Sequence, residues 1–309
     1  MGASPFLTRR EAVCPPDLLA RAQEIKSPRV AIAAAGSALP MEAAFEAAQA
    51  GIMEPVFVGD PAEIRAAAGK LVWNISGFQI IPADGEEACA AAAAQACGEG
   101  AADVLMKGHL HSDTFMRAAV SRSAGLRTGA RFVHIFHLTH PDGGKPLLVS
   151  DAAVNVAPNI ETRQDALKNM VHLLQVLGNT RPKVAVLSAT ESVIESVPSS
   201  VEADEIVTWA RDAVTDADVA GPLALDGILS PDAASIKKMH GPVPGHADAI
   251  LVPDIVSGNA IFKSFVYLSG ACAAGVVMGA KVPILLTSRA DPAQARLASV
   301  ALASIIANG

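Results

Sequence analysis

Apolar runs of strand length alternate with helical stretches through the first hundred residues of the chain. Residues 29–35, RVAIAAA, form a continuous apolar run that predicts a buried strand, because strands covered by helices on both faces are apolar throughout. The same pattern predicts further elements: strands at 54–58, 78–81 and 102–106, and helices at 18–26, 41–50, 62–68 and 86–97. This alternation predicts a mostly parallel, doubly wound sheet.

The pattern changes after residue 130. Residues 131–138 (RFVHIFHL) and 145–150 (KPLLVS) are apolar strands joined by HPDGG, a reverse-turn sequence, so we expect them to form an antiparallel pair. A second α/β series follows, with helices at 161–177, 202–211 and 230–238 and strands at 183–187 and 249–252. The chain is therefore expected to form two α/β lobes that divide near 150–160 and meet in a cleft.

The stretch 253–291 carries two polar clusters around a buried unit. The SGN cluster at 257–259 is expected to cap a helix that ends at 278–280. Residues 282–286 then form an apolar strand, and Thr287, Ser288 and Arg289 follow at its carboxyl end. Open α/β sheets hold their ligands at that end of their strands. We therefore expect the function to lie between the SGN and TSR clusters.

Three aspartates stand where helices are expected to begin. Asp17, Asp60 and Asp291 each precede a predicted helix, the last of which covers 292–307. A proline follows both Asp60 and Asp291, and proline suits the first helical position because that position needs no amide hydrogen bond. We expect all three aspartates to act as caps.

Composition narrows the classes of protein and partner. Of the 309 residues 51% are apolar and only 4% aromatic, and the net charge is −7 without any Lys/Arg run, which argues against a nucleic-acid partner. No apolar run reaches the roughly 18 residues that a membrane span needs, and the N-terminus lacks the apolar core of a signal peptide. The cysteines form no CxxC pair, so we expect reduced structural thiols and a cytoplasmic protein; they are Cys14, Cys89, Cys97 and Cys272.

The segment 105–117, LMKGHLHSDTFMR, is the first candidate site. It leaves a predicted strand, passes through a glycine and enters a helix that Ser112 or Asp113 is expected to cap. A helix N-terminus beside cationic side chains favours an anion. The alternative is an ordinary strand-to-helix turn, but lysine, glycine and two histidines together favour function. The residues expected to bind are Lys107, Gly108, His111 and Arg117.

Other polar residues are weaker candidates. Arg131 is equally a phosphate ligand or a solvated charge at a strand end. His134 and His137 lie three apart on a strand and thus on opposite faces, so they cannot hold a metal together, and packing roles are expected. Asn155, near Asp151, can orient a ligand or brace the crossover, and bracing is slightly favoured.

Several known cofactor and nucleophile motifs are missing. The chain has neither a phosphate-binding G-x-x-x-x-G-K-[ST] loop nor a G-x-S-x-G elbow. The glycines of 270–275 are expected to lie within a helix, without the strand that precedes a dinucleotide fingerprint. A nicotinamide cofactor is therefore not expected.

Six segments in order resemble the phosphate acetyltransferase/phosphate butyryltransferase family. They run from about Ala102 to the C-terminus: LMKGHLHSDTFMRAAV, GLRTGARFVH, SDAAVNVAPN, GPLALDGILS, VPDIVSGNAIFKS and AGVVMGAKVPILLTSRAD. These segments most resemble those of the butyryltransferase branch and of the phosphotransacetylase-like domain of enoyl-CoA hydratase fusions. The resemblance implies two α/β/α lobes with a cleft between them, as in isocitrate and isopropylmalate dehydrogenases, formed by 1–155 plus about 275–309 and by 156–274.

The resemblance also implies a reaction. A short-chain acyl group, from acetyl to butyryl, passes reversibly between coenzyme A and inorganic phosphate by direct attack of the thiol on an acyl phosphate. No metal and no tightly bound cofactor are implied, because acyl-CoA and phosphate are substrates. A homodimer or higher homo-oligomer is implied, without nucleic acid or membrane as partner.

Site residues follow from the matched segments. Ser288 and Arg289 are implied at the reacting end, near the phosphate-binding segment that contains Lys107. The other implied substrate-binding residues are Asn155, Ser257, Gly258, Asn259, Lys263 and Thr287. One departure stands out, because Leu286 occupies the position at which acetyltransferases carry an aspartate proposed as the base for the thiol.

Two rival functions remain at this stage. The missing aspartate motivates a catalytically weak or inactive domain that senses acyl-CoA or mediates oligomerisation. A decarboxylating dehydrogenase of the similar fold would need clustered metal-binding aspartates and a cofactor loop, which the sequence lacks.

Overall fold

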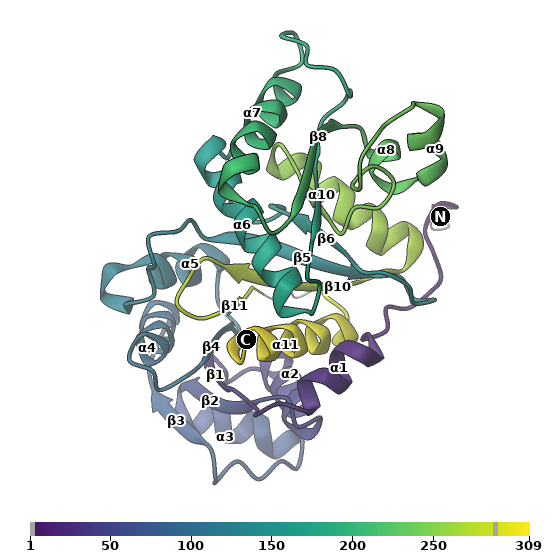
Figure 1. The fold of residues 1–309 in the computed structure, drawn as a ribbon. Coiled ribbons are helices and arrows are strands. Elements are labelled where there is room, and N and C mark those ends of the chain that lie inside the picture. Colours follow the sequence, from purple (N-terminus) through teal and green to yellow (C-terminus); the bar gives the residue numbers. More distant parts are fainter. Residues whose placement is uncertain (1–3, 287–289) are drawn as a thin grey trace. The chain divides into compact units, whose positions relative to one another are not determined.

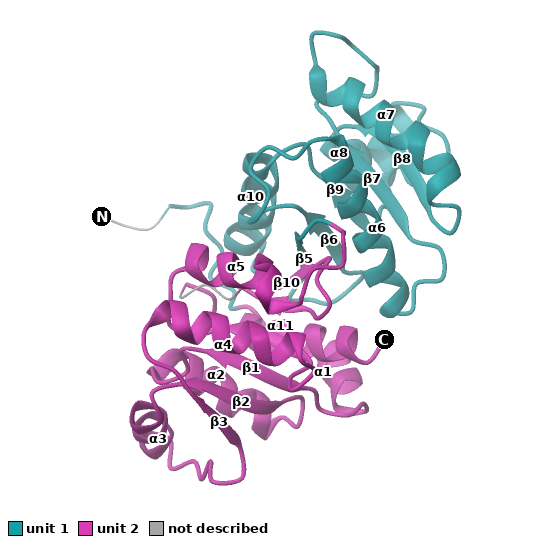
Figure 2. Ribbon diagram, turned by 90° about the vertical axis from the view of Figure 1, so that its left-hand side faces the viewer, with its two compact units in different colours: residues 1–11, 131–273 teal, residues 12–130, 274–309 magenta. Residues whose placement is uncertain are grey.

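The computed structural model describes residues 4–286 and 290–309. The chain forms two compact units (Figure 2): unit 1 comprises Met1–Glu11 and Arg131–Ala273, and unit 2 comprises Ala12–Ala130 and Ala274–Gly309. Both units have a mixed α/β fold, as predicted. The predicted lobes grouped 131–155 with the N-terminal half, whereas these residues lie in unit 1. Within the described parts of the chain, no helix is long and apolar enough to cross a membrane.

Unit 2 contains a parallel sheet in the order β3-β2-β1-β4-β11 (Figure 1). Its strands are β1 (Arg29–Ala33), β2 (Glu54–Gly59), β3 (Gln79–Pro82), β4 (Val104–Lys107) and β11 (Ile284–Leu285). Its helices are α1 (Pro16–Gln23), α2 (Ala38–Gln49), α3 (Pro61–Lys70), α4 (Glu86–Gly98), α5 (Ser112–Val120) and α11 (Ala293–Ala307), with a short 3₁₀ turn η1 (Arg122–Ala124). The alternation predicted from the apolar pattern is confirmed.

Unit 1 begins its sheet with the predicted antiparallel pair. Strand β5 (Val133–Thr139) pairs antiparallel with β6 (Leu147–Ser150), and the order continues through β9 (Ala249–Leu251), β7 (Lys183–Leu187) and β8 (Asp218–Leu223) in parallel. Strand β8 was not predicted. The helices are α6 (Ile160–Val176), α7 (Pro198–Ala213), α8 (Leu225–Leu229), α9 (Pro231–Ile236) and α10 (Ile255–Ser264), followed by a π turn η2 (Phe265–Ser269).

One of the three predicted aspartate caps is confirmed. The Asp60 side chain accepts hydrogen bonds from the amides of Ala62 (2.6 Å) and Glu63 (3.0 Å) at the start of α3. The other two predictions are wrong, because Pro15 and Pro292 occupy the cap positions of α1 and α11. In both cases the proline ring fixes the extended backbone before the helix, so no side-chain cap is made.

The predicted helix through 257–280 is also wrong. Asp254 caps α10, its side chain accepting from the Ser257 amide at 2.8 Å, so SGN lies within the first turns of the helix. The helical segment ends at Gly270, which has a left-handed backbone with φ of 78°. Strand β10 (Cys272–Met278) follows, with the antiparallel pair Val277 and Ile284 to β11. The small apolar residues of this segment show neither a clear helical nor a clear strand periodicity, so the sequence did not reveal the end of the helix. The glycine with a left-handed backbone ends it.

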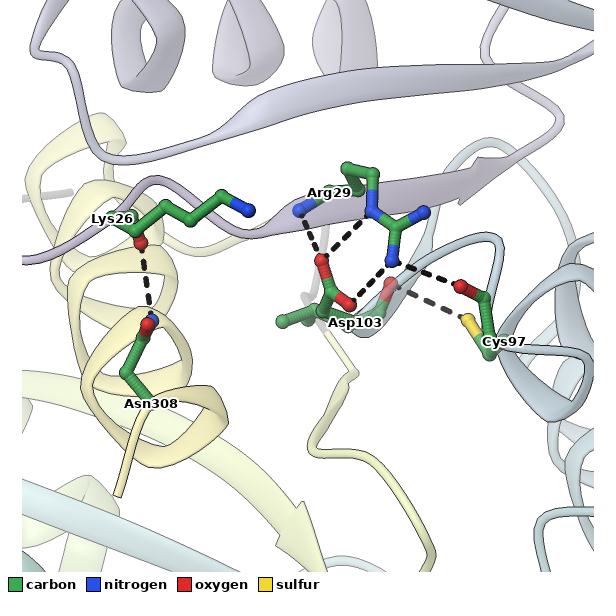
Figure 3. A network of polar contacts seen from close by, with 7 residues as sticks. Lys26, Arg29, Cys97, Asp103 and Asn308 are labelled. Atoms are coloured by element: carbon green, nitrogen blue, oxygen red, sulfur yellow. Dashed lines mark hydrogen bonds and ion pairs between the residues drawn. The ribbon is translucent and has the colours of Figure 1, made fainter.

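A polar network closes the amino-terminal edge of the sheet in unit 2 (Figure 3). The guanidinium of Arg29 on β1 donates to Asp103 before β4, at 2.8 Å from Nη2 to Oδ1 and 3.1 Å from Nε to Oδ2. This hydrogen-bonded pair lowers the pKa of Asp103 and raises that of Arg29. The Asn308 amide donates to the Lys26 carbonyl oxygen at 3.1 Å, which fastens the end of α11. These hydrogen bonds and the ion pair therefore stabilise the amino-terminal edge of the sheet.

Candidate functional site

The loop after β4 is locked against the end of β1. The Gly108 amide donates to the Ala33 carbonyl oxygen at 2.9 Å, and the His109 amide donates to that of Ala34 at 3.1 Å. A Cβ atom on Gly108 would lie 2.2 Å from the first oxygen and 2.6 Å from the second, so only glycine fits there. Lys107 precedes the loop and is only 6% exposed.

This loop lies at a topological switch point of unit 2. Strand β1 lies between β2 and β4 in the sheet, so the connection from β1 through α2 to β2 leads away from β4. The carboxyl ends of β1 and β4 therefore border the crevice where doubly wound sheets hold ligands. The predicted segment that begins at Lys107 occupies this edge.

His111 forms the start of α5 in a way the sequence did not predict. Neither Ser112 nor Asp113 caps the helix, because His111 is the cap residue and its own side chain makes no cap bond. Instead its amide donates to Glu86 Oε2 at 3.0 Å, and its ring Nδ1 lies 3.0 and 2.9 Å from the two Glu86 carboxylate oxygens. These hydrogen bonds lower the pKa of Glu86, and the bond from the His111 amide has a larger effect than that from the ring.

Arg117 lies farther along the groove between α4 and α5. Its Nη2 donates to Asp113 Oδ2 at 3.4 Å, a long ion pair with both side chains mostly exposed. The same side chain borders a hollow of about 350 Å³ between the two helices. The lining residues are Glu87, Ala91, Gln95, Thr114, Arg117, Ala118, Ser121, Ser123 and Ala124. His111, Thr114 and Ala118 are spaced three and four apart, so they share one side of α5.

In unit 1, Asp151 organises the loop that follows β6. Its carboxylate accepts hydrogen bonds from the amides of His134 (3.0 Å), Ala153 (2.9 Å) and Val154 (2.9 Å). The Asn155 side-chain amide donates both to Asp151 at 2.7 Å and to the Phe132 carbonyl oxygen at 2.8 Å. Asn155 thus braces the loop through its nitrogen, as the sequence slightly favoured, and keeps its side-chain oxygen for other partners.

The SGN cluster packs α10 against that same loop. A Cβ atom on Gly258 would lie 2.5 Å from the Asp151 carbonyl oxygen, so the helix approaches the loop backbone directly. Asn259 donates to the Ala152 carbonyl oxygen at 3.4 Å, which is a long bond. Lys263 is exposed and lies about one helical turn beyond Asn259. Gly258 therefore has a packing role, whereas Ser257, Asn259 and Lys263 are at least partly accessible.

His134 and His137 are core residues of β5, as expected. They are 2% and 4% exposed, and burial lowers the pKa of each to about 4. The His134 ring packs edge-on against Phe136 with centroids 4.3 Å apart, and Phe136 stacks on Phe262 of α10 at 4.0 Å. Both imidazoles are therefore neutral near pH 7.

Part of the predicted site lies outside the described residues, namely Thr287, Ser288 and Arg289. Leu286 directly follows β11, whose Leu285 is paired with Met106 of β4. Glu86, the hydrogen-bond partner of His111, was not predicted from the sequence. The only local signal was a pair of glutamates in the first turn of α4, which also occurs in ordinary helices. Among the residues with described positions, no group of three or more His, Cys, Asp or Glu could hold a metal ion.

The sheet order of unit 2 defines a doubly wound α/β protein in which the loop between β4 and α5 lies at a switch point. The chain belongs to the phosphate acetyl/butaryl transferase family, whose model matches residues 86–304. It is 39% identical over 265 residues to the phosphate acetyltransferase of Rhizobium meliloti, an alignment that covers 85% of this chain and 84% of that relative. The predicted family is confirmed.

Solved structures agree on the fold. A branched-chain phosphotransacylase from Enterococcus faecalis superimposes with a TM-score of 0.80 at 29% identity, over 90% of this chain and 98% of that one. The 4-hydroxythreonine-4-phosphate dehydrogenase of Klebsiella pneumoniae gives a TM-score of 0.58 at 12% identity, over 92% and 100%. At that identity the likeness concerns the fold alone, and it supports the predicted dehydrogenase-like α/β fold.

Proposed function

We propose that the protein is a phosphate acyltransferase that moves a short-chain acyl group reversibly between coenzyme A and inorganic phosphate. The observation that carries the proposal is the family match over 86–304, which includes the β4–α5 loop at the switch point of unit 2. In this reaction the thiol of coenzyme A attacks the carbonyl carbon of an acyl phosphate. Phosphate then leaves from a tetrahedral oxyanion, so the site must bind anions and stabilise developing charge.

The edge that holds Lys107 and Gly108 suits the phosphate end of this reaction. The glycine at 108 locks the loop that follows β4 against the end of β1, and the charges of Lys107 and Arg117 favour an anion. We assign Ser288 and Arg289 to the reacting phosphoryl and carbonyl oxygens. They follow Leu285 by three and four residues, and an extended chain spans at most about 3.5 Å per residue, so this assignment is compatible with the β11–β4 pairing.

The remaining predicted residues are assigned to coenzyme A. Asn155 offers its side-chain oxygen, and Ser257, Asn259 and Lys263 offer accessible polar groups on α10. Thr287 is assigned with them, as a neighbour of the reacting pair in the sequence. The role of Gly258 is to let α10 approach the loop that carries Asn155.

The first test measures release of free coenzyme A with DTNB from acetyl-, propionyl- and butyryl-CoA, with and without phosphate. The buried cysteines keep the protein's own background low. Arg289→Ala should lower phosphate-dependent release roughly 100-fold or more, because removing one oxyanion ligand typically costs that much. Exposed Arg65 on α3 supplies the control, Arg65→Ala.

Near-normal turnover of Arg289→Ala would contradict the assignment of Arg289 to the reacting oxygens. Tight acetyl-CoA binding by the wild type without phosphate- or arsenate-dependent release would favour an acyl-CoA sensor instead. That alternative rests only on the leucine at position 286.

We also propose a cytoplasmic homodimer. All four cysteines are free and buried, which fits a reducing compartment. The segment 255–269 carries one charge, at Lys263, yet leaves large apolar side chains open to solvent: Val256 is 73% exposed, Tyr267 52% and Leu268 51%. Large exposed apolar side chains gathered on one segment mark protein–protein contacts, and a second copy of the chain is the proposed cover.

Light scattering tests the dimer. The wild type should have the mass of two chains, and Val256→Glu with Leu268→Glu should shift it toward the mass of one, because each glutamate would have to be desolvated at the contact. An exposed site elsewhere, Val72→Glu, should leave the mass unchanged, since Val72 is 93% exposed in unit 2. A monomeric wild type would contradict the proposal.

A further inference from the structure

We propose that His111 accepts the proton of the coenzyme A thiol and that Glu86 positions its ring for this transfer. The inference rests on the proposed acyl transfer and narrows the role of His111 within it. A resident proton acceptor is useful, because a free thiol has a pKa of about 8.5 and is only a few per cent ionised at neutral pH. Leu286 offers no carboxylate for the purpose.

The geometry of the pair fixes which ring nitrogen is available. A carboxylate can only accept hydrogen bonds, so the contacts of 2.9 and 3.0 Å to Glu86 require the proton of the neutral ring on Nδ1. The lone pair then lies on Nε2. The His111 side chain is 73% exposed, so Nε2 is open to a substrate. This is the arrangement by which a carboxylate orients a catalytic imidazole in other enzymes.

Glu86 is held in place from two directions. Its Oε2 accepts from the His111 backbone amide at 3.0 Å, so ring and peptide of one residue are tied to one carboxylate. Its own backbone starts α4 after Gly85, whose φ of 80° requires a glycine-like conformation. Because these hydrogen bonds lower the pKa of Glu86, the group stays ionised at neutral pH and stabilises the imidazolium when it forms.

The surroundings give the imidazole a mixed electrostatic environment. Its own loop and helix carry Lys107, His109, Asp113 and Arg117, and the packed α4 side carries Asp84 and Glu87. Arg122 of η1 lies at the other end of α5. The groove that contains Arg117 begins on the same side of α5 as His111. An anionic substrate bound there would lie on the same side of α5 as His111.

The proton and electron balance is complete within the substrates. Nε2 takes the proton from the S–H bond, and the sulfur electron pair forms the C–S bond to the carbonyl carbon. The tetrahedral oxyanion collapses, the C–O bond to phosphate breaks, and phosphate leaves with that electron pair. The imidazolium then returns its proton to phosphate or water. In the reverse direction the same imidazolium protonates the departing thiolate.

The test uses His111→Gln and Glu86→Gln in the direction from acyl phosphate and coenzyme A. His111→Gln should lower kcat about 10²- to 10⁴-fold, the usual contribution of a proton-transfer residue, with KM values changed little. The loss should shrink as pH rises through the thiol pKa, because thiolate then needs no base. Glu86→Gln should lower kcat about 10- to 100-fold while its amide oxygen still accepts from the His111 amide.

Matched controls separate this role from structural effects. His240→Gln and Glu99→Gln replace exposed residues, the second on the far end of α4, and both should retain wild-type kinetics. In His111→Ala, added imidazole should restore part of kcat, which a purely structural or anion-binding residue would not show. Thermal unfolding of each variant verifies the fold.

Distinct outcomes identify which proposal fails. A raised KM for phosphate or acyl phosphate with kcat retained in His111→Gln would make His111 an anion ligand and overturn the inference. A pH-independent loss without imidazole rescue would overturn it as well. Both results require an active wild type, so they differ from failure of the proposed function, in which the wild type itself shows no transfer.

Discussion

Replacing Gly108 with alanine should destabilise the protein by more than about 3 kcal/mol and remove its activity. The added Cβ would lie 2.2 Å from the carbonyl oxygen of Ala33, the last residue of β1, and 2.6 Å from that of Ala34, which follows it. Neither oxygen can move without breaking the backbone hydrogen bonds of 2.9 and 3.1 Å that join the two loops. Overpacking of this kind typically costs about 1–3 kcal/mol, and the lost hydrogen bonds add to it.

Urea unfolding measures the effect, with Gly77→Ala as the matched control. Gly77 is also a glycine of unit 2 outside helices and strands, and a Cβ there would meet nothing within 4 Å. The control should unfold at the wild-type urea concentration. If Gly108→Ala behaved like the control and kept activity, the close approach of the β1 and β4 loops would not constrain the site.

Acid should destabilise the protein steeply between pH 6.5 and 4 because of His134 and His137. Burial lowers the pKa of each from 6.5 to about 4. In that range the unfolded chain binds a proton at each histidine and the folded chain does not, so stability falls as the pH falls. The contribution is fully present above pH 6.5, and each histidine accounts for a loss on the order of 3 kcal/mol by pH 4.

Urea unfolding at pH 7, 5.5 and 4.5 provides the measurement. His134→Phe should unfold with a shallower dependence on pH than the wild type, because the ring at this position packs against Phe136 and a phenyl ring does not titrate. Exposed His172 on α6 gives the control, His172→Gln, which should keep the wild-type dependence. Equal pH slopes for His134→Phe and wild type would show that this histidine does not drive the acid transition.

Several strands could be predicted from the sequence, because a buried strand is a short run of apolar residues. The run KVAVL is strand β7, Lys183–Leu187, with the predicted bounds, and the antiparallel pair around HPDGG is also confirmed. The region 257–280 failed for a physical reason. Its alanines, glycines and valines suit helix and strand alike, and the break at Gly270 becomes visible only through its backbone angles.

The candidate site was predictable residue by residue but not in its pairings. The sequence pointed to His111, yet its partner Glu86 is 25 positions away and resembles an ordinary helix-start glutamate. Asp151 was named only as a neighbour of Asn155, whereas its carboxylate holds the turn that follows β6. Pairings of this kind depend on which loops a sheet brings together, and that order is not encoded in local spacing.

The insertion of β11 beside β4 has a consequence for synthesis of the protein on the ribosome. Residues 12–130 emerge early, but β4 gains its second neighbour only when Ile284 and Leu285 have been made. Helix α11 arrives later still, and its Ser304 hydroxyl donates to the Ile52 carbonyl oxygen near β2. Unit 2 therefore cannot close co-translationally from its N-terminal segment. Until β11 has been made, the apolar edge of β4 stays open, and an open apolar edge is a site of aggregation during folding.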